Sequence, residues 1–199
     1  VDDDPLSGAS ITDMRKLLHR PAGIHGAPTR AGDAIKLPKG GAIRFWGVNA
    51  SMASTRQLRA QQARFYAKHG VNLVRQHPVQ GAIGLLQGSG AKKSFDAARL
   101  DAFDHWFATL KAEGIYMAFS PFYPHVITKA DGYPAALYAE LPDRGAGKST
   151  SGMVNFMRPL QDAQWEWLKA LLEHKNPYTG LRYVDDPALA IVETHNEDC

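Results

Sequence analysis

The sequence predicts an α/β fold in which strands and helices alternate around a parallel sheet. Short apolar runs rich in β-branched residues alternate with segments of helical spacing. Turns from helix to strand are tight, as at Glu113-Gly114-Ile115, whereas the segments after the strands are long and reach an extreme at 122–158. This asymmetry is typical of a barrel whose site lies at the carboxyl ends of its strands. A doubly wound sheet fits the same rhythm, but the turn at 47–51 lacks the glycine-rich phosphate fingerprint.

Four strands and three helices follow from the local patterns. The strands are expected at 43–48, 71–74, 115–119 and 189–192. Ser54 or Thr55 can cap the first helix, which ends at Gly70. The residues expected to face inward from the three helices share helical spacing and are Leu58, Phe65 and Tyr66; Leu100, Phe103, Phe107 and Leu110; and Trp165, Leu168 and Leu172.

Two regions differ in composition. Residues 1–42 are rich in Gly, Pro and Asp, and we interpret them as an N-terminal cap with a short hairpin or two. Residues 43–199 carry the strand–helix rhythm. The segment 145–150 resembles the end of a phosphate-binding loop, but Pro142 stands where that motif needs Gly, so a flexible polar surface loop is the better interpretation.

Composition excludes several classes of partner. The 199 residues are 44% hydrophobic and carry a net charge of only +3, with Lys and Arg scattered, so no nucleic-acid surface is indicated. Arg56, Arg59, Arg64 and Lys68 are interpreted as one solvated helix face. The single cysteine, Cys199, allows neither an internal disulfide nor a cysteine zinc site. No apolar run approaches the roughly 20 residues of a membrane helix.

Polar residues follow the first three strands. Arg75 and His77 come directly after the second, and a buried Arg needs a carboxylate partner, either a catalytic acid or a structural one. His125, in the aromatic segment after the third strand, could line a sugar-stacking platform or pack in a loop. Trp46 and Asn49 close the first strand, although Trp46 could equally be core.

The end of the fourth strand carries the densest set of chemical groups. Glu193, Asn196 and Glu197 cluster there, and carboxylates are costly to bury without a role. Glycoside hydrolysis needs a carboxylic acid that protonates the leaving oxygen, and a neighbouring Asn can bond a sugar hydroxyl. A metal site that uses His195 is the rival, but an extended strand projects these side chains in a row rather than around one point.

Several segments together resemble the clan A glycoside hydrolases, the barrel enzymes that include cellulases and β-mannanases, and especially bacterial cellulase-like proteins of family 5 type. The matching segments, given in chain order, are 21–26, 43–49 (IRFWGVN), 69–75 (HGVNLVR), 113–116, 176–183 (NPYTGLRY) and 186–193 (DPALAIVE).

The resemblance implies a (β/α)8 TIM barrel, present here as about its first four strand–helix units, and a retaining two-carboxylate reaction on a β-linked poly- or oligosaccharide. It implies Glu197 as acid/base with Asn196 beside it, and matches Arg75 and, more loosely, His125. We expect Arg75, His77, His125, Trp46 and Asn49 to bind substrate, with no metal or organic cofactor. Asp198 departs from the family, where many relatives have Pro.

The family nucleophile is a second Glu on the seventh strand, which this sequence does not contain. We expect Glu193 to support the site rather than to replace that nucleophile. The chain is therefore expected to be a fragment, inactive alone, or a half that pairs with the missing C-terminal half-barrel. The alternative is a non-catalytic carbohydrate-binding or vestigial half-barrel. Because polysaccharides lie outside the cell, a secreted or periplasmic protein is expected.

Overall fold

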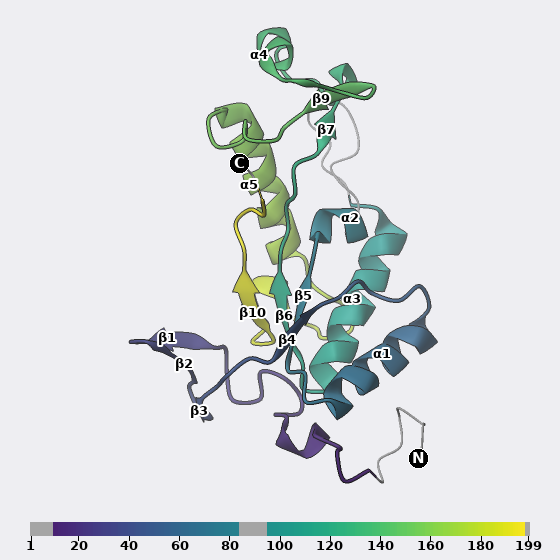
Figure 1. Cartoon of the computed structure of the whole chain (residues 1–199), viewed down its shortest axis with the longest axis vertical. Coiled ribbons are helices and arrows are strands. Elements are labelled where there is room, and N and C mark those ends of the chain that lie inside the picture. Colours follow the sequence, from purple (N-terminus) through teal and green to yellow (C-terminus); the bar gives the residue numbers. More distant parts are fainter. Residues whose placement is uncertain (1–9, 84–94, 198–199) are drawn as a thin grey trace.

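A four-stranded parallel sheet forms the centre of the molecule. The computed structural model describes residues 10–83 and 95–197. The strands are β4 (Gly47–Asn49), β5 (Leu73–Gln76), β6 (Tyr116–Phe119) and β10 (Leu189–Val192), and the sheet order is β10-β6-β5-β4 (Figure 1). All three pairings are parallel. The predicted α/β architecture with a parallel sheet is thus confirmed.

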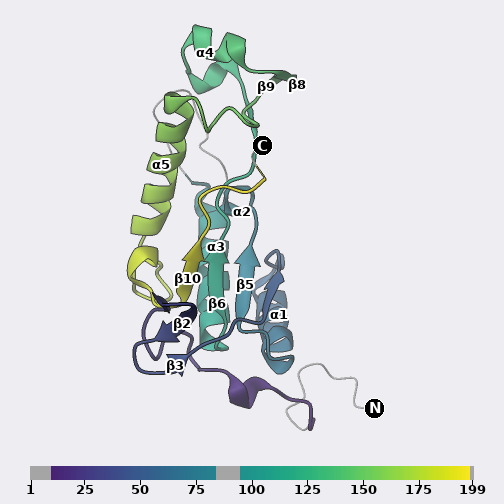
Figure 2. The ribbon, with the colours of Figure 1, turned by 60° about the vertical axis from the view of Figure 1, so that its left-hand side comes forward.

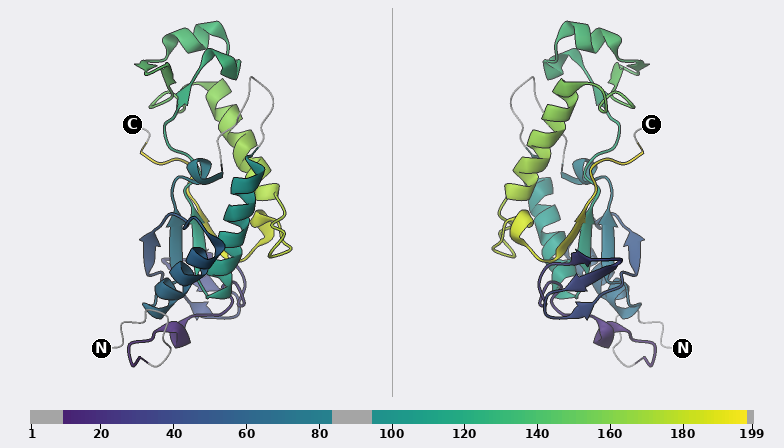
Figure 3. Two further views of the ribbon diagram at one scale, coloured as in Figure 1. Left: turned by 90° about the vertical axis from the view of Figure 1, so that its right-hand side faces the viewer. Right: turned by 90° about the vertical axis from the view of Figure 1, so that its left-hand side faces the viewer.

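Three long helices cover one side of this sheet. They are α1 (Arg56–Lys68), α3 (Ala97–Ala112) and α5 (Arg158–Glu173), with the short α2 (Val79–Ile83) above α3 (Figures 2 and 3). Phe103, Trp106 and Phe107 of α3 are fully buried against Phe119 and neighbouring core residues. In the part of the chain that is described, the other face of the sheet has no helix over it (Figure 3).

The helix boundaries follow local signals, as expected. Thr55 caps α1, and its hydroxyl accepts the Leu58 N–H at 3.2 Å. Asp96 caps α3 through the Arg99 N–H. The fourth strand occupies the residues that the sequence predicted, whereas the first is shorter and later, because its pairing with β5 begins only at Gly47.

The predicted inward face of α1 is wrong for Leu58 and Phe65, whereas Tyr66 does pack against the core. Leu58 and Phe65 are 46% and 43% exposed, whereas Ala63 and Ala67 are fully buried. The small alanines let the helix lie close to its neighbours, so the larger residues turn outward. The expected solvated face of α1 is also corrected, because Arg59 is buried and donates to the carbonyls of Ala53 and Ser54.

Two further expectations about single elements need correction. Trp165 on α5 is 65% exposed, and Trp167 and Leu171 take the buried positions. The segment expected to be a flexible polar loop is a hairpin, formed by β8 (Asp143–Arg144) and β9 (Gly147–Ser149). The antiparallel pairing of these two strands provides hydrogen-bond partners for their backbone groups, so the segment adopts regular structure.

This hairpin belongs to a small unit beyond the carboxyl end of the main sheet. Strand β7 (Val126–Ile127) pairs with β9, and the 3-10 turn η2 (Lys129–Asp131) and α4 (Ala135–Glu140) complete the unit (Figure 1). Its own apolar cluster comprises Ile127, Leu137, Leu141, Val154 and Leu160. The long segment after the third strand is therefore structured.

The N-terminal segment caps the opposite end of the sheet. After the 3-10 turn η1 (Arg15–Leu17), strands β1 (Thr29–Ala31), β2 (Ala34–Leu37) and β3 (Gly41–Ala42) form an antiparallel sheet. Another 3-10 turn, η3 (Tyr183–Asp185), precedes β10.

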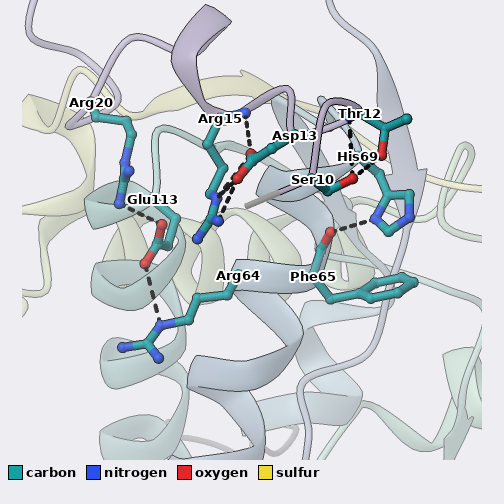
Figure 4. Close-up of polar contacts among 9 residues, drawn as sticks. All are labelled: Ser10, Thr12, Asp13, Arg15, Arg20, Arg64, Phe65, His69 and Glu113. Atoms are coloured by element: carbon teal, nitrogen blue, oxygen red, sulfur yellow. Dashed lines mark hydrogen bonds and ion pairs between the residues drawn. The ribbon is translucent and has the colours of Figure 1, made fainter. Parts of the chain in front are cut away.

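Ion pairs fasten the cap to the helix ends. Glu113, at the end of α3, lies between Arg20 of the cap and Arg64 of α1, with N–O distances of 2.6 and 3.8 Å (Figure 4). The same view shows Arg15 on the carboxylate of Asp13. No helix within the described residues is long and apolar enough to cross a membrane.

Candidate functional site

Arg75, the third residue of β5, is bonded to polar groups from three other strand ends. Its Nη2 donates to Oε2 of Glu193 at 2.6 Å and to Oδ1 of Asn196 at 2.6 Å. Its Nη1 donates to Oδ1 of Asn49 at 3.3 Å. The structure thus brings together three residues that the sequence singled out, Arg75, Asn49 and Asn196, at the carboxyl edge of the sheet.

Strand register explains this convergence. Asn49 pairs with Arg75, and Arg75 pairs with Ala118. Because side chains alternate along a strand, Arg75 and Ser120 point to the same face. The Glu193 N–H bonds the carbonyl of Phe119, which brings Glu193 to the same level. The shared face is the one that the helices do not cover, and the alternate residues Val74, Gln76 and Phe119 are buried.

Ser120 joins the site, and the sequence analysis missed it. It directly follows β6 and is fully buried. Its Oγ lies 3.0 Å from Nη2 of Arg75 and 2.7 Å from Nδ1 of His77. Its position directly after a strand could have identified it as a site residue, since the first residue after each parallel strand reaches this edge. A single serine, however, belongs to no sequence motif that would single it out.

His77 lies next to this group and is half-buried. Its ring meets the ring of Tyr123 edge to face, with centroids 5.6 Å apart. Partial burial lowers the pKa of His77, and the nearby charge of Arg75 lowers it further, whereas Glu193 and Glu197 oppose the shift. The imidazole is therefore held toward its neutral form.

Glu193 behaves as the counter-ion of Arg75. Partial burial acts to raise the pKa of Glu193, but hydrogen bonds from Ser120 and Arg75, with the charge of Arg75, outweigh it and lower that pKa. A general acid needs the opposite shift, toward the working pH. The carboxylate partner expected for Arg75 is thus Glu193, in a supporting place, and not Glu197.

The segment after β10 turns at Asn196 and Glu197. The Asn196 N–H bonds the carbonyl of Phe122 at 3.3 Å, and the ring of His195 stacks on that of Phe122 with centroids 6.4 Å apart. Glu197 is exposed and has a positive φ of 48°. The expected acid/base role of Glu197 stays a prediction.

Two predicted site residues lie elsewhere. Trp46 precedes β4, and its backbone pairs with Asn72: its N–H donates to Asn72 Oδ1 at 2.7 Å and its C=O accepts the Asn72 N–H. It therefore does not close the first strand as expected, but lies three residues, about 10 Å of strand, before Asn49. His125 directly precedes β7 of the small sheet, where its N–H donates to Thr150 Oγ1 and its C=O accepts the Thr150 N–H. Binding roles for both stay predictions.

The carboxylate groups do not assemble as a metal site within the described ranges. No cluster of three or more His, Cys, Asp and Glu side chains is found there that could hold an ion. Asp198, where the sequence departs from the family it resembles, lies outside the described residues, as does Cys199.

Comparison with known proteins supports the fold. No family model matches the chain, and no curated protein matches it. Among solved structures, the endo-1,4-beta-mannanase from Rhizomucor miehei matches with a TM-score of 0.60 and 18% identity, over 86% of this chain and 48% of that one. At this identity the likeness shows a common fold. The chain therefore spans about half the length of that mannanase.

Proposed function

We propose that this chain is the first half of a (β/α)8 glycoside hydrolase barrel that acts on a β-linked poly- or oligosaccharide. The observation that carries the proposal is the bonding of Arg75 to Asn49, Glu193 and Asn196 at the carboxyl edge of a parallel sheet. In barrel enzymes this edge carries the chemistry. The fold shared with an endo-1,4-beta-mannanase supports the same class of substrate.

In this proposal Glu197 protonates the leaving oxygen and Asn196 bonds a sugar hydroxyl. Arg75 donates two bonds through one nitrogen, and its bond to Asn196 Oδ1 orients the amide so that its NH2 group is available to a ligand. Glu193 keeps Arg75 neutralised and oriented. No metal or organic cofactor enters this reaction.

The second carboxylate of a retaining reaction belongs in this proposal to a complementary half-barrel. Strands β4 and β10 each pair on one side only among the described residues. On the outer surface of α1, Leu58 and Phe65 are large and exposed. Both features suit further strand–helix units that would close the sheet. Export from the cell belongs to the proposal because its substrates lie outside cells.

To test the proposal, the native gene product is isolated and its mass is measured. Its activity is then assayed on aryl β-mannosides, aryl β-glucosides and the corresponding β-1,4-glycans. We expect hydrolysis with retention, and Glu197→Gln is expected to lower kcat by about 10²–10⁴ because a general acid is lost. Asp162→Asn, an exposed change on α5, is the matched control and should leave kcat unchanged.

A Glu197→Gln variant that loses only two-fold in kcat contradicts the acid/base assignment. Binding of oligosaccharides without hydrolysis by the native product supports the alternative, a non-catalytic carbohydrate-binding half-barrel. A native product that ends at Cys199, folds and remains monomeric contradicts the proposal that a complementary half-barrel completes the site.

A further inference from the structure

Arg75 determines how two neighbouring side-chain amides are oriented. An Arg side chain can only donate hydrogen bonds, whereas an amide accepts through its oxygen and donates through its NH2 group. Nη1 of Arg75 lies 3.3 Å from Oδ1 of Asn49, and Nη2 lies 2.6 Å from Oδ1 of Asn196. If either amide were flipped, its NH2 group would face the guanidinium, and two donors would oppose each other. Both oxygens are therefore turned toward Arg75.

The NH2 ends of these two amides have no partner among the described residues. Asn49 is exposed and Asn196 is half-buried, so solvent or a ligand can take up their hydrogens. Asn72, before β5, shows the contrast. Its amide donates to the carbonyl of Arg44 and accepts the N–H of Trp46, so both of its ends are occupied. The structure thus leaves two fixed donors open at the carboxyl edge of the sheet.

Arg75 itself has little left to offer a ligand. Its Nε donates to Glu193, and the hydrogens of Nη2 are shared among Glu193, Ser120 and Asn196. One hydrogen of Nη1 goes to Asn49, which leaves a single hydrogen on that nitrogen without a partner in the described ranges. The carboxylate of Glu193, at 2.6 Å, balances the charge of the guanidinium. The two amides therefore offer a ligand uncharged donors.

We propose that Arg75 is a positioning residue, which fixes the amides of Asn49 and Asn196 so that their NH2 groups donate together to oxygens of one neutral sugar unit. Because both amides are bonded to the same guanidinium, they lie close enough to serve one unit. The carbohydrate nature of the ligand rests on the proposed function. The orientation of the amides does not, because it follows from the contacts of Arg75 alone.

NMR of the ligand-free chain tests the orientation directly. Relaxation of ¹⁵N in the side-chain NH2 groups reports how freely each amide moves. We expect the amides of Asn49 and Asn196 to be ordered, like that of Asn72. A freely rotating amide at either position overturns the proposal. This measurement needs no variant, so it decides the orientation even if substitutions at Arg75 unfold the chain.

The Arg75→Lys variant tests the cause. A single ammonium cannot reproduce the fork of contacts that a guanidinium makes. At least one of the amides of Asn49 and Asn196 should therefore become mobile, whereas that of Asn72, which Arg75 does not contact, should stay ordered. A folded Arg75→Lys protein in which both site amides remain ordered overturns the positioning role.

The Asn49→Asp variant separates donation to the ligand from contact with Arg75. A carboxylate still accepts from Arg75 but has no hydrogen for a sugar oxygen. In the native gene product, we expect Kd for a β-1,4-linked manno-oligosaccharide to rise about ten-fold, as for one lost hydrogen bond. Asn155→Asp, at an exposed residue before α5, makes the same change of charge and should leave Kd unaltered. An unaltered Kd in folded Asn49→Asp overturns the donor role.

Titration of the native gene product tests the class of sugar. We expect the NH2 resonances of Asn49 and Asn196 to move together with a manno-oligosaccharide. A β-1,4-linked oligomannuronate, which carries a carboxylate in place of CH2OH, should bind no more tightly, and tighter binding overturns the neutral ligand. Movement of Asn196 alone overturns the paired role. If neither amide moves with either sugar at saturating concentration, the sugar-binding role falls with the proposed function, and the orientation is decided by the ligand-free measurement.

Discussion

Arg75 connects the polar groups at the edge of the sheet. Its guanidinium spans Asn49 on one side and Asn196 on the other, and it meets Glu193 through both Nε and Nη2. The planar fork of Arg makes such multiple contacts possible, and the single ammonium of Lys cannot reproduce them. The ion pair with Glu193 therefore fixes the orientation of the Arg75 guanidinium as well as neutralising its charge.

Replacing Arg75 by Lys should raise the pKa of Glu193 toward its ordinary range, because two charge-assisted bonds are lost. A folded-state pKa below the unfolded value means that ionised Glu193 stabilises the native state above about pH 4.3, and this contribution is lost as the pH falls through the lowered pKa. Titration of the Glu193 carboxyl by ¹³C NMR measures the shift.

Arg158→Lys is the control for this change, because Arg158 pairs with Asp162 at the surface of α5. That variant should leave the pKa of Glu193 where it is in the parent chain. An unaltered pKa in Arg75→Lys would show that Arg75 is not the group that holds Glu193 ionised.

At the scale of elements, a buried ion pair joins α3 to the start of β10. Lys111, in the last turn of α3, lies 2.8 Å from both carboxylate oxygens of Asp186. The Asp186 side chain is 1% exposed and also accepts the Ala188 N–H at 3.0 Å. This carboxylate thus holds the turn that leads into β10, the strand that Glu193 directly follows.

Asp186→Asn should lower the free energy of unfolding by about 3 kcal/mol, because it leaves the Lys111 charge without its partner in a largely buried place. Urea unfolding measures the difference. Asp162→Asn breaks an exposed pair with Arg158 and should cost less than about 1 kcal/mol. Equal losses in the two variants would contradict the buried pair as a source of stability.

At the scale of the whole molecule, the cap packs directly against the amino end of the parallel sheet. The fully buried Ala22 donates its N–H to the carbonyl of Lys111 at 2.8 Å. Gly23 has a φ of +83°, and a Cβ there would lie 2.6 Å from Cγ of Pro187. Cap, α3 and the turn before β10 therefore meet at one point, where only glycine fits.

Gly23→Ala should destabilise the chain by more than Gly32→Ala. Both positions have positive φ, which costs an alanine about 1–2 kcal/mol. Nothing lies within 4 Å of a Cβ at Gly32, so that variant shows the backbone strain alone. The difference between the two in thermal or urea unfolding measures the clash with Pro187. A difference of zero would mean that the cap moves away without cost.

The local parts of the fold could be predicted from the sequence. The cap at Thr55, the buried stripe of Phe103, Phe107 and Leu110, and the strand at 189–192 each depend on neighbours along the chain. At the site, the expected position of Arg75 at the carboxyl end of a strand was sufficient to predict a carboxylate partner, and the structure places Arg75 within β5 near that end. The resemblance to a barrel enzyme placed Asn196 at the same edge, where the structure has it.

Sequence alone thus determined the α/β rhythm, the strand that ends just before Glu193 and the need of Arg75 for a carboxylate, because periodicity and charge are properties of the chain itself. Tertiary structure decided which carboxylate that is, brought Ser120 Oγ to 2.7 Å from Nδ1 of His77, and started the first strand after Trp46, which the sequence had placed within it. These outcomes depend on register between β4, β5, β6 and β10, and register is set by contacts between residues far apart in sequence.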